Sequence, residues 1–374
     1  MEKWIECKIS DIGTVVGGAT PSTKKPENYE NGDIAWITPK DLSSFSGRYI
    51  QRGERNITEI GLKSCSTQLL PKDTVLFSSR APIGYVAIAE NAVCTNQGFK
   101  SVIPNEDTDP IFLYYLLKYN KDKIESMGSG TTFKEVSGNT MKNIVVSVPQ
   151  DKQVQEKIAS VLDAIDEKIE ENERINNNLE QQVTTAFYNM FGKYEQISNT
   201  HKPLSTIAKF KYGTMPKKDK LGTGHYHAFS GYQIVGTYPE VMFENPQLII
   251  VARGVGGCGD VKYTPANCYL TNLSIAIITE KTMHDDYLYH YLRLHDTKIM
   301  NTGSAQPQIT VATLEKIEIP IPPEEEMIRF SDFVQPFKQQ YRNNQDENKL
   351  LSKLRDTLLS KLMSGELDIS DIDI

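Results

Sequence analysis

An internal duplication constrains the fold more than any other feature of this sequence. The apolar run at 74–80 ends in Arg80 and recurs about 173 residues later at 248–253, where it ends in Arg253. Four further pairs of segments follow in the same order, namely 94–97 with 269–272, 112–117 with 287–292, 130–136 with 303–309, and 144–149 with 317–322. A period of this length indicates a domain written twice. The mixture of short apolar runs and helical patterns predicts an α/β (α+β) fold with two similar domains.

Each copy is followed by a long helical pattern with a heptad seam. Spacings of four and three connect Ile158, Leu162, Ile165, Ile169, Asn172, Asn176, Leu179, Val183, Ala186 and Met190. The same spacing, shifted by 172, connects Phe330, Val334, Phe337, Tyr341, Asn344, Asn348, Leu351, Arg355, Leu358 and Leu362. Two asparagines interrupt both seams at the same places, and Arg355 is the later polar exception. A buried asparagine at a seam position fixes register at a cost in stability.

These matched asparagines favour pairing of the two helices with each other. We therefore predict an antiparallel pair of long coiled-coil helices that separates two domains in a pseudo-two-fold arrangement. Each helix of roughly 35 residues would measure about 50 Å at 1.5 Å per residue. The alternative is an ordinary amphipathic helix packed on a globular core. Pro336 is expected to kink the second helix or to mark where its regular part begins.

The predicted boundaries follow the helix starts. Pro149 precedes the first helix, and Pro322 followed by Glu324–Glu326 precedes the second, with acid in the first turn as the helix dipole favours. The predicted organisation is domain 1 at 1–148, spacer helix 1 at 149–192, domain 2 at 193–320, and spacer helix 2 with the C-terminal tail at 321–374.

Charge is distributed unevenly over this organisation. The 374 residues carry a net charge of −7, which by itself argues against a nucleic-acid partner. Residues 149–192 hold 4 basic and 9 acidic residues, and residues 321–374 hold 7 and 11, so the acidity lies in the two helical segments. The domain at 1–148 holds 17 of each kind, and 193–320 holds 13 basic and 11 acidic residues. A DNA-reading surface on the two domains is compatible with this pattern.

Several classes of protein are not expected from the sequence. No run of eighteen apolar residues is present, so no membrane span is expected, and the N-terminus lacks the pattern of a secretory signal. The cysteine count of five is odd and no pair is spaced C-x-x-C, which favours a reducing cytoplasm. The sequence contains neither a P-loop nor a G-x-S-x-G elbow.

Two similar domains at the ends of a rigid rod suit a DNA reader whose half-sites lie about 34 Å apart. The glycine-rich, hydroxylated and basic loop at 17–25 has its equivalent at 212–220, and such side chains are common phosphate ligands. Because the loops of the two domains differ, the two half-sites should differ in sequence. The candidate DNA-contacting residues in copy one are Thr20, Ser22, Lys24, Lys25, Lys40, Arg80, Asn96, Gln97, Lys100, Thr131, Thr132 and Lys134. Those in copy two are Lys217, Lys218, Lys220, His225, His227, Gln233, Arg253, Asn272, Ser304 and Gln306.

Some motifs admit other interpretations. Residues 254–259 match G-x-G-x-x-G, but the following residues indicate a strand and not the helix that a dinucleotide fold needs, which favours a tight turn. His225 and His227 with Cys258 and Cys268 fit no standard zinc spacing, so no metal site is expected. Asn96 and Asn272 have a structural alternative as turn caps. Two other functions stay open from the residues: a nucleotide-binding enzyme that uses the glycine turn, and a coiled-coil adaptor without DNA specificity.

The organisation resembles the specificity subunits of type I restriction-modification systems over nearly the whole chain. The resemblance rests on the alternation of domain and helix and on local motifs. These motifs are Gly18-x-Thr20-Pro21-Ser22, Gly32-x-Ile34-x-Trp36-Ile37, Asn96-Gln97-Gly98, Val148-Pro149, 319–323, and the ending Leu358-Leu359-Ser360-Lys361-Leu362-Met363-Ser364-Gly365-Glu366-Leu367. Copy two departs from the Thr-Pro-Ser form at Met215-Pro216-Lys217, which weakens the expectation of DNA contacts there.

The resemblance implies two target-recognition domains that read the two parts of a bipartite, asymmetric site in double-stranded DNA. It implies that the helical regions bind two methyltransferase subunits, and that a restriction (motor-nuclease) subunit joins for cleavage. No cofactor is expected on this chain, because S-adenosylmethionine and ATP with Mg²⁺ would belong to the partner subunits. The chain itself would be non-catalytic.

Replacement of Asn172, Asn176, Asn344 and Asn348 by leucine should raise the free energy of unfolding and loosen the register of the helices, because buried amides sacrifice stability for specificity. Denaturant unfolding measures the first effect, and the spacing of recognised half-sites measures the second. Unchanged stability together with unchanged spacing would contradict the antiparallel pair.

Overall fold

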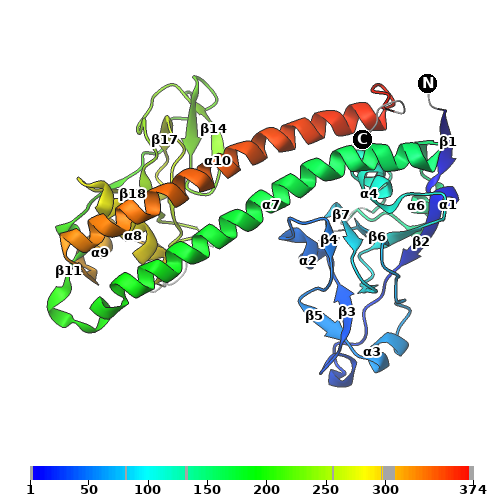
Figure 1. Cartoon of the computed structure of the whole chain (residues 1–374), viewed down its shortest axis with the longest axis horizontal. Coiled ribbons are helices and arrows are strands. Elements are labelled where there is room, and N and C mark those ends of the chain that lie inside the picture. The colour runs from blue at the N-terminus through cyan, green and yellow to red at the C-terminus, as the bar shows by residue number, and fades with distance from the viewer. Residues whose placement is uncertain are drawn as a thin grey trace. The chain divides into compact units, whose positions relative to one another are not determined.

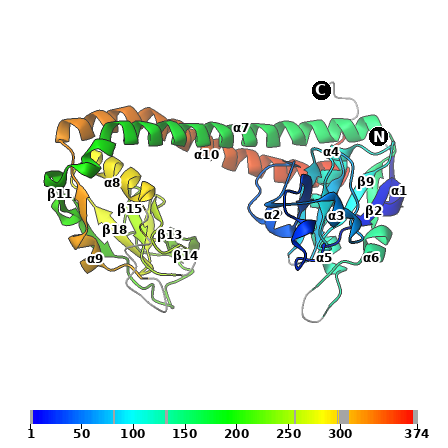
Figure 2. The same ribbon diagram turned by 90° about the horizontal axis from the view of Figure 1, so that it is seen from below.

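The computed structural model describes residues 3–80, 82–130, 134–254, 257–295, 297 and 308–369. The chain divides into two compact units. Unit 1 comprises Met1–Arg174 and Asn344–Ile374, and unit 2 comprises Ile175–Asn343. Each unit therefore contains one sheet domain and a part of each long helix (Figure 1 and Figure 2).

Unit 1 is built on a five-stranded sheet beside a three-stranded one. The large sheet has the order β2 (Gly13–Gly17), β9 (Lys100–Pro104), β6 (Val75–Ser79), β7 (Ile83–Ala89) and β4 (Tyr49–Ile50). The small sheet has the order β5 (Arg55–Ile57), β3 (Ile34–Ile37) and β8 (Cys94–Thr95), and β1 (Trp4–Lys8) pairs with β10 (Val145–Pro149). The short helices are α1 (Ile9–Ile12), η1 (Pro26–Asn28), α2 (Pro39–Ser43), α3 (Glu59–Lys63), α4 (Pro110–Tyr119), α5 (Lys121–Ser126) and α6 (Gly138–Asn143).

Unit 2 repeats this plan with one strand fewer in its large sheet. That sheet has the order β12 (Lys209–Tyr212), β18 (Ser274–Ile278), β15 (Leu248–Val251) and β16 (Val261–Tyr263). The small sheet has the order β14 (Ile234–Tyr238), β13 (Tyr226–Phe229) and β17 (Cys268–Leu270), and β11 (His201–Pro203) pairs with β19 (Glu318–Pro320). The short helices in its described part are η2 (Gly192–Gln196), η3 (Ser198–Thr200), η4 (Leu204–Thr206), α8 (Thr282–Leu294) and α9 (Val311–Lys316).

The two sheet domains share connectivity as well as composition. Strand β3 pairs parallel with β8, and β13 pairs parallel with β17 at the equivalent place. The buried apolar run of β6 pairs antiparallel with β9, as β15 pairs with β18. This confirms the prediction of two similar α/β domains from the duplicated motifs.

The two long helices are α7 (Lys152–Phe191) and α10 (Glu324–Met363), each of 40 residues. Within unit 1 they run antiparallel, because Leu162 shares a core with Leu362 while Asn172, further along α7, bonds to the earlier Asn348. Within unit 2 the ring of Phe191 packs against that of Phe330 at 5.2 Å. The predicted antiparallel pair is confirmed. The expectation that Pro336 marks the beginning of the regular helix is wrong, because α10 starts twelve residues earlier.

The seam asparagines in unit 1 are satisfied across the helix pair. Asn172, which is 1% exposed, donates from Nδ2 to Asn348 Oδ1 at 2.8 Å and to Glu347 Oε2 at 2.7 Å. Asn348 Nδ2 donates to the carbonyl of Ile169 at 3.3 Å. The side chains of Asn176 and Asn344 are also buried. A slip of one helix along the other would break the bonds of Asn172 and Asn348, which is the physical reason that such pairs specify register.

Arg355, the polar exception in the second seam, belongs to a buried charge network. Its Nη1 donates to Asp166 Oδ1 at 2.7 Å, and Tyr115 of α4 donates its hydroxyl proton to Asp166 Oδ2 at 2.8 Å. Arg48, which is 3% exposed, donates to both carboxylate oxygens of Glu170 on α7 at 3.0 Å. The network therefore fastens the sheet domain of unit 1 to both long helices.

Replacement of Arg355 by leucine should destabilise unit 1 by about 3 kcal/mol, because it leaves Asp166 buried without its cation. The double variant Asp166→Leu with Arg355→Leu should recover most of that loss. Fluorescence of Trp4 and Trp36, the only two tryptophans and both in unit 1, follows its unfolding in urea. Arg174→Leu is the control, since that exposed side chain pairs with Glu171 on its own helix. Equal stability of the wild type and Arg355→Leu would contradict this role.

Candidate nucleic-acid interface

One arginine stands at the same place in each sheet domain. Arg80 follows β6 and forms a β-bridge with Glu135, and Arg253 follows β15 and forms the equivalent bridge with Gln308. The neighbouring hydrogen bonds also match, since Val136 N donates to Ser79 O and Ile309 N donates to Ala252 O, both at 2.9 Å. The duplication therefore places Arg80 and Arg253 in equivalent positions. Each arginine pairs through its backbone with the corresponding residue of its own copy, Glu135 in copy one and Gln308 in copy two.

The surroundings of these arginines differ in charge. In copy one, the Glu135 carboxylate lies between two cations. Its Oε2 is 3.9 Å from Arg80 Nη1, and its Oε1 is 3.3 Å from Lys100 Nζ. Lys100 also lies 3.4 Å from the hydroxyl of Ser79. In copy two, the neutral Gln308 occupies the position of Glu135. Each copy thus presents a different set of hydrogen-bonding groups on the same backbone frame.

The two glycine-containing loops are also built alike. A Cβ atom on Gly18 would lie 2.2 Å from Thr95 O, and one on Gly213 would lie 2.1 Å from Thr271 O. The next residue donates its backbone N–H in both copies, Ala19 to Thr95 O at 3.0 Å and Thr214 to Leu270 O at 2.9 Å. The glycines therefore permit close packing on the small sheet, and phosphate contacts would fall to the side chains of the loops.

The structure places the predicted side chains of these loops mostly on the surface. Thr20 bonds to Gln97, and both are exposed. The exposed residues of the two loops also include Ser22, Lys24, Lys25, Lys217 and Lys218. Two further predicted lysines have carboxylate partners, Lys40 with Glu54 at 2.7 Å and Lys220 with Glu240 at 2.6 Å. The hydrogen bond to its carboxylate raises the pKa of Lys40, and of Lys220 likewise, so both remain cationic.

The remaining candidates fall into three groups. Asn96 acts as a turn cap, because its Oδ1 accepts a hydrogen bond from Gly98 N at 2.8 Å, while Asn272 is half-buried. Exposed side chains that remain candidates are Lys134, His225, His227 and Gln233. Thr131, Thr132, Ser304 and Gln306 lie outside the described residues. Within the described ranges, no cluster of three His, Cys, Asp or Glu side chains is arranged to hold a metal ion.

Gly254, Gly257 and Gly259 lie between β15 and β16. Gly254 has a φ of 120°, and a Cβ there would lie 2.3 Å from the hydroxyl oxygen of Tyr232. A Cβ on Gly257 would lie 2.7 Å from the same ring, and Tyr232 donates its hydroxyl proton to Arg253 O at 2.6 Å. A strand follows, as predicted, so the glycines serve packing and the nucleotide-binding interpretation is not favoured.

Sequence reasoning missed three residues of this region. Glu135 and Gln308 lie inside the repeated segments 130–136 and 303–309, so alignment of the two copies could have identified them. Tyr232 has no such signal, because its packing on the glycine turn appears only in three dimensions.

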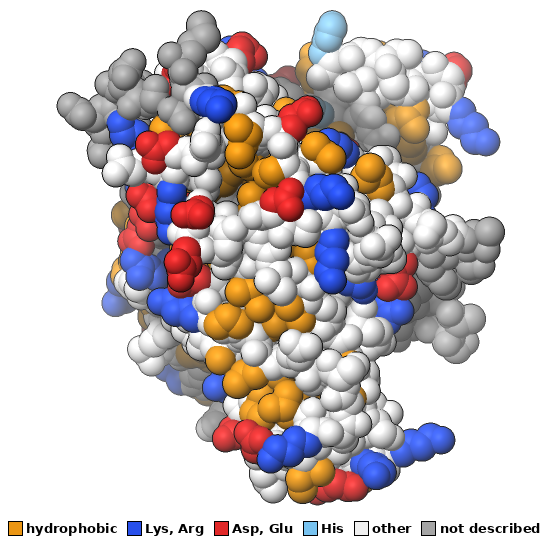
Figure 3. Space-filling model, turned by 90° about the vertical axis from the view of Figure 1, so that its right-hand side faces the viewer, with side chains coloured by type: hydrophobic (Ala, Val, Ile, Leu, Met, Phe, Trp, Pro, Cys, Tyr) orange, Lys and Arg blue, Asp and Glu red, His pale blue; other side chains and the backbone are white. Residues whose placement is uncertain are grey.

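Figure 3, which looks onto one face of the molecule, shows acidic and basic side chains interspersed on that face.

Each sheet domain has one arginine just after an inner strand of its large sheet and exposed lysines in its glycine-containing loop, an arrangement that suits a two-domain DNA reader. Comparison with protein families makes this specific. The model of the type I restriction modification DNA specificity domain matches residues 1–181 and 198–353. The chain belongs to this family.

Relatives of similar length agree with this assignment. The chain is 33% identical to the type I restriction enzyme MjaIX specificity subunit of Methanocaldococcus jannaschii over 414 aligned positions, which cover 99% of this chain and 94% of the relative. It is 23% identical to the EcoprrI specificity subunit of Escherichia coli, with 88% and 86% of the two chains covered. The crystal structure of the S subunit from M. genitalium shares the fold, with a TM-score of 0.64, 18% identity and 96% of each chain covered.

Simultaneous replacement of Lys24 and Lys25 by alanine should reduce the salt dependence of binding to duplex DNA. The slope of log K against log salt should fall in magnitude by about 1–2, because each lost phosphate contact removes about 0.9. Fluorescence anisotropy over a range of salt concentrations measures the slope. Lys349→Ala is the matched control, because this exposed lysine of α10 pairs with Asp346 of its own helix. An unchanged slope in the double variant would remove the loop from the DNA interface.

Proposed function

We propose that this chain is the non-catalytic specificity subunit of a type I restriction-modification enzyme. It reads a bipartite, asymmetric site in double-stranded DNA and docks two adenine-methyltransferase subunits. One observation carries the proposal: the family's duplicated domain holds Arg80 and Arg253 at equivalent positions with different neighbours, Glu135 and Gln308. Equivalent placement supports the same task in both domains, and different neighbours support different base sequences.

The chemistry of these side chains suits the base edges in the major groove. An arginine fork donates to both acceptors of guanine, a glutamate accepts from the amino group of cytosine, and a glutamine pairs with adenine. The copy with Arg80 and Glu135 and the copy with Arg253 and Gln308 are therefore suited to different half-sites. The exposed lysines of the loops at 17–25 and 212–220 supply the contacts to phosphates.

The long helices support a protein partner in place of DNA. Their segments are acidic, and α10 exposes apolar side chains along its length. In unit 2, Phe333 and Tyr341 are 42% and 37% exposed, and in unit 1, Leu350 and Leu354 are 70% and 48% exposed. Spacings of four and eight residues place each pair on one face of the helix. Exposed apolar side chains on an acidic helix fit a macromolecular interface in each unit, here with the methyltransferase subunits.

The chemistry of the reaction belongs to the partners under this proposal. A methyltransferase subunit would hold S-adenosylmethionine and flip the adenine out of the stack, and ATP with Mg²⁺ would act on a restriction subunit. Under this proposal the chain positions the partner subunits on the DNA, and its own residues bind no cofactor. Among the described residues, no helix is both long and apolar enough to cross a membrane. All five cysteines are unpaired, which supports placement in the cytoplasm. Family membership disfavours an adaptor without DNA specificity.

Methylation mapping tests the proposal directly. The chain is expressed with its presumed methyltransferase partner in a host without DNA methylation, and the modified adenines are sequenced. The expected result is a split, asymmetric motif with a fixed gap that disappears when this chain is omitted. Absence of a new motif, or a continuous palindromic one, would overturn the assignment.

The variant Glu135→Gln makes copy one resemble copy two and sharpens the same experiment. It should shift base preference by about tenfold or more at one half of the motif, since a hydrogen-bonded base contact discriminates by about 1–3 kcal/mol. The reciprocal variant Gln308→Glu should affect only the other half. A change in both halves from one substitution would contradict independent reading by the two domains.

A further inference from the structure

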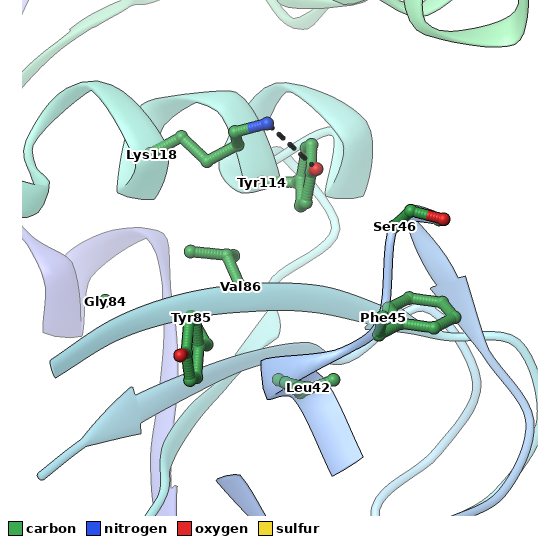
Figure 4. A pocket seen from close by; sticks show the side chains of 9 residues that line it. Leu42, Phe45, Ser46, Gly84, Tyr85, Val86, Tyr114 and Lys118 are labelled. Carbon is green, nitrogen blue, oxygen red and sulfur yellow. Dashed lines mark hydrogen bonds between the residues drawn. The ribbon is translucent and has the colours of Figure 1, made fainter. Parts of the chain in front are cut away.

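Unit 1 contains a cavity of about 180 Å³ that none of the candidate DNA-contacting residues lines. It is bounded by α4, the beginning of β7 and the segment that connects α2 to β4 (Figure 4). Phe45, Tyr85 and Tyr114 give it aromatic walls, Val86 adds an aliphatic side chain, and Lys118 is the one cationic residue among those that line it.

Lys118 is a sheltered cation without a carboxylate partner. Its Nζ donates to the hydroxyl of Tyr114 at 3.1 Å, as Figure 4 shows. Among the described residues, no carboxylate oxygen lies within 4.0 Å of this Nζ, and the nearby Asp166 and Asp356 both bond to Arg355. Burial lowers the pKa of Lys118, and the neighbouring carboxylate of Asp166 offsets this only in part.

The equivalent position in the second domain contains an ion pair. Tyr114 and Lys118 correspond to Tyr289 and Arg293 in the aligned segments, and Arg293 likewise bonds to the hydroxyl of its tyrosine, at 2.5 Å. Arg293 also binds Glu180 of α7 at 2.5 Å. The shift of 172 that relates the long helices assigns Ser352 of α10 to the position of Glu180. Copy one therefore keeps the cation and the phenol of this arrangement and lacks the carboxylate.

We infer that the cavity beside Lys118 receives an aspartate or glutamate side chain of the methyltransferase subunit that docks on unit 1. This inference rests on the proposed function, since it names a contact within the proposed assembly. The acid would take the place that Glu180 fills within unit 2. Aromatic walls exclude water around such a pair and strengthen it, as long as both charges are hydrogen-bonded.

The surroundings favour a protein carboxylate over a DNA phosphate. The connecting segment that lines the cavity leads directly into Arg48, which binds Asp163 and Glu170 of α7. That helix is acidic, so it repels a duplex, which carries many phosphates, more strongly than a single carboxylate. A phosphate in a duplex is fixed to a stiff backbone, whereas a carboxylate on a flexible side chain can enter a recess.

The test is the affinity of the full-length chain for the purified methyltransferase subunit, measured by isothermal titration calorimetry. Lys118→Met keeps the aliphatic stem and removes the charge, and it should weaken binding by at least about tenfold, because a buried acid would lose its partner. Lys118→Arg copies the residue of the second domain and should bind within a few-fold of wild type. Thermal melting of each variant checks that unit 1 remains folded.

The outcomes separate the two proposals. Failure of the wild-type chain to bind the methyltransferase would overturn the proposed docking function itself. Normal wild-type binding with equal affinity of Lys118→Met would overturn only the cavity contact. Loss of DNA affinity in Lys118→Met, measured on the isolated chain with methyltransferase binding unchanged, would instead assign Lys118 to the DNA. Weaker methyltransferase binding that Lys118→Arg restores would support the carboxylate contact.

Discussion

The sharing of both long helices by the two units is the constraint on which the structure depends. In unit 1 the domain from the first copy buries Leu362, Met363 and Ile369 from the end of the chain in the same core as Phe112 and Leu116. In unit 2 the helix that follows the first copy contributes Val183, Phe187 and Phe191 to the core of the second domain. Each buried large apolar side chain is worth about 1.5–3 kcal/mol, so removal of either helix half would leave a domain with a large exposed core face.

Apolar packing alone would tolerate a shifted helix, and the polar groups in the seam remove that freedom. Asn172 meets its partners only in one register, and Asp166 is buried with Arg355 and Tyr115 at fixed distances. Unit 2 solves the same problem with different residues, since the carboxylate of Asp286 on α8, 1% exposed, bonds to Ser331 and Gln335 on α10. A sequence-specific reader needs defined geometry, and these groups supply it within each unit at some cost in stability.

The sequence predicts the buried strands and the long helices of this molecule better than it predicts the contacts of surface residues. The repeated apolar runs at 74–80 and 248–253 predict β6 and β15, because buried strands need such runs in any context. The heptad seams predict α7 and α10 for the same reason. Pro336 does not mark the start of α10, because a helix held by tertiary packing tolerates the lost hydrogen bond. The capping bond of Asn96 joins it to Gly98, two residues away, and the local sequence already offered that role. The packing of Tyr232 on the glycines after β15 depends on residues distant in sequence and gives no local signal.

The difference between the copies is as informative as their likeness. A duplication begins with two identical domains. Packing then keeps the buried residues of the strands and helices similar, while surface residues diverge freely. Glu135 against Gln308 is such a divergence beside the arginines, and it suits two unlike half-sites. Lys118 against Arg293 is another, where one copy satisfies its cation with Glu180 of the chain itself and the other leaves it facing a cavity. A symmetric frame with asymmetric side chains is what the reading of an asymmetric site physically requires, because two identical surfaces can discriminate only identical half-sites.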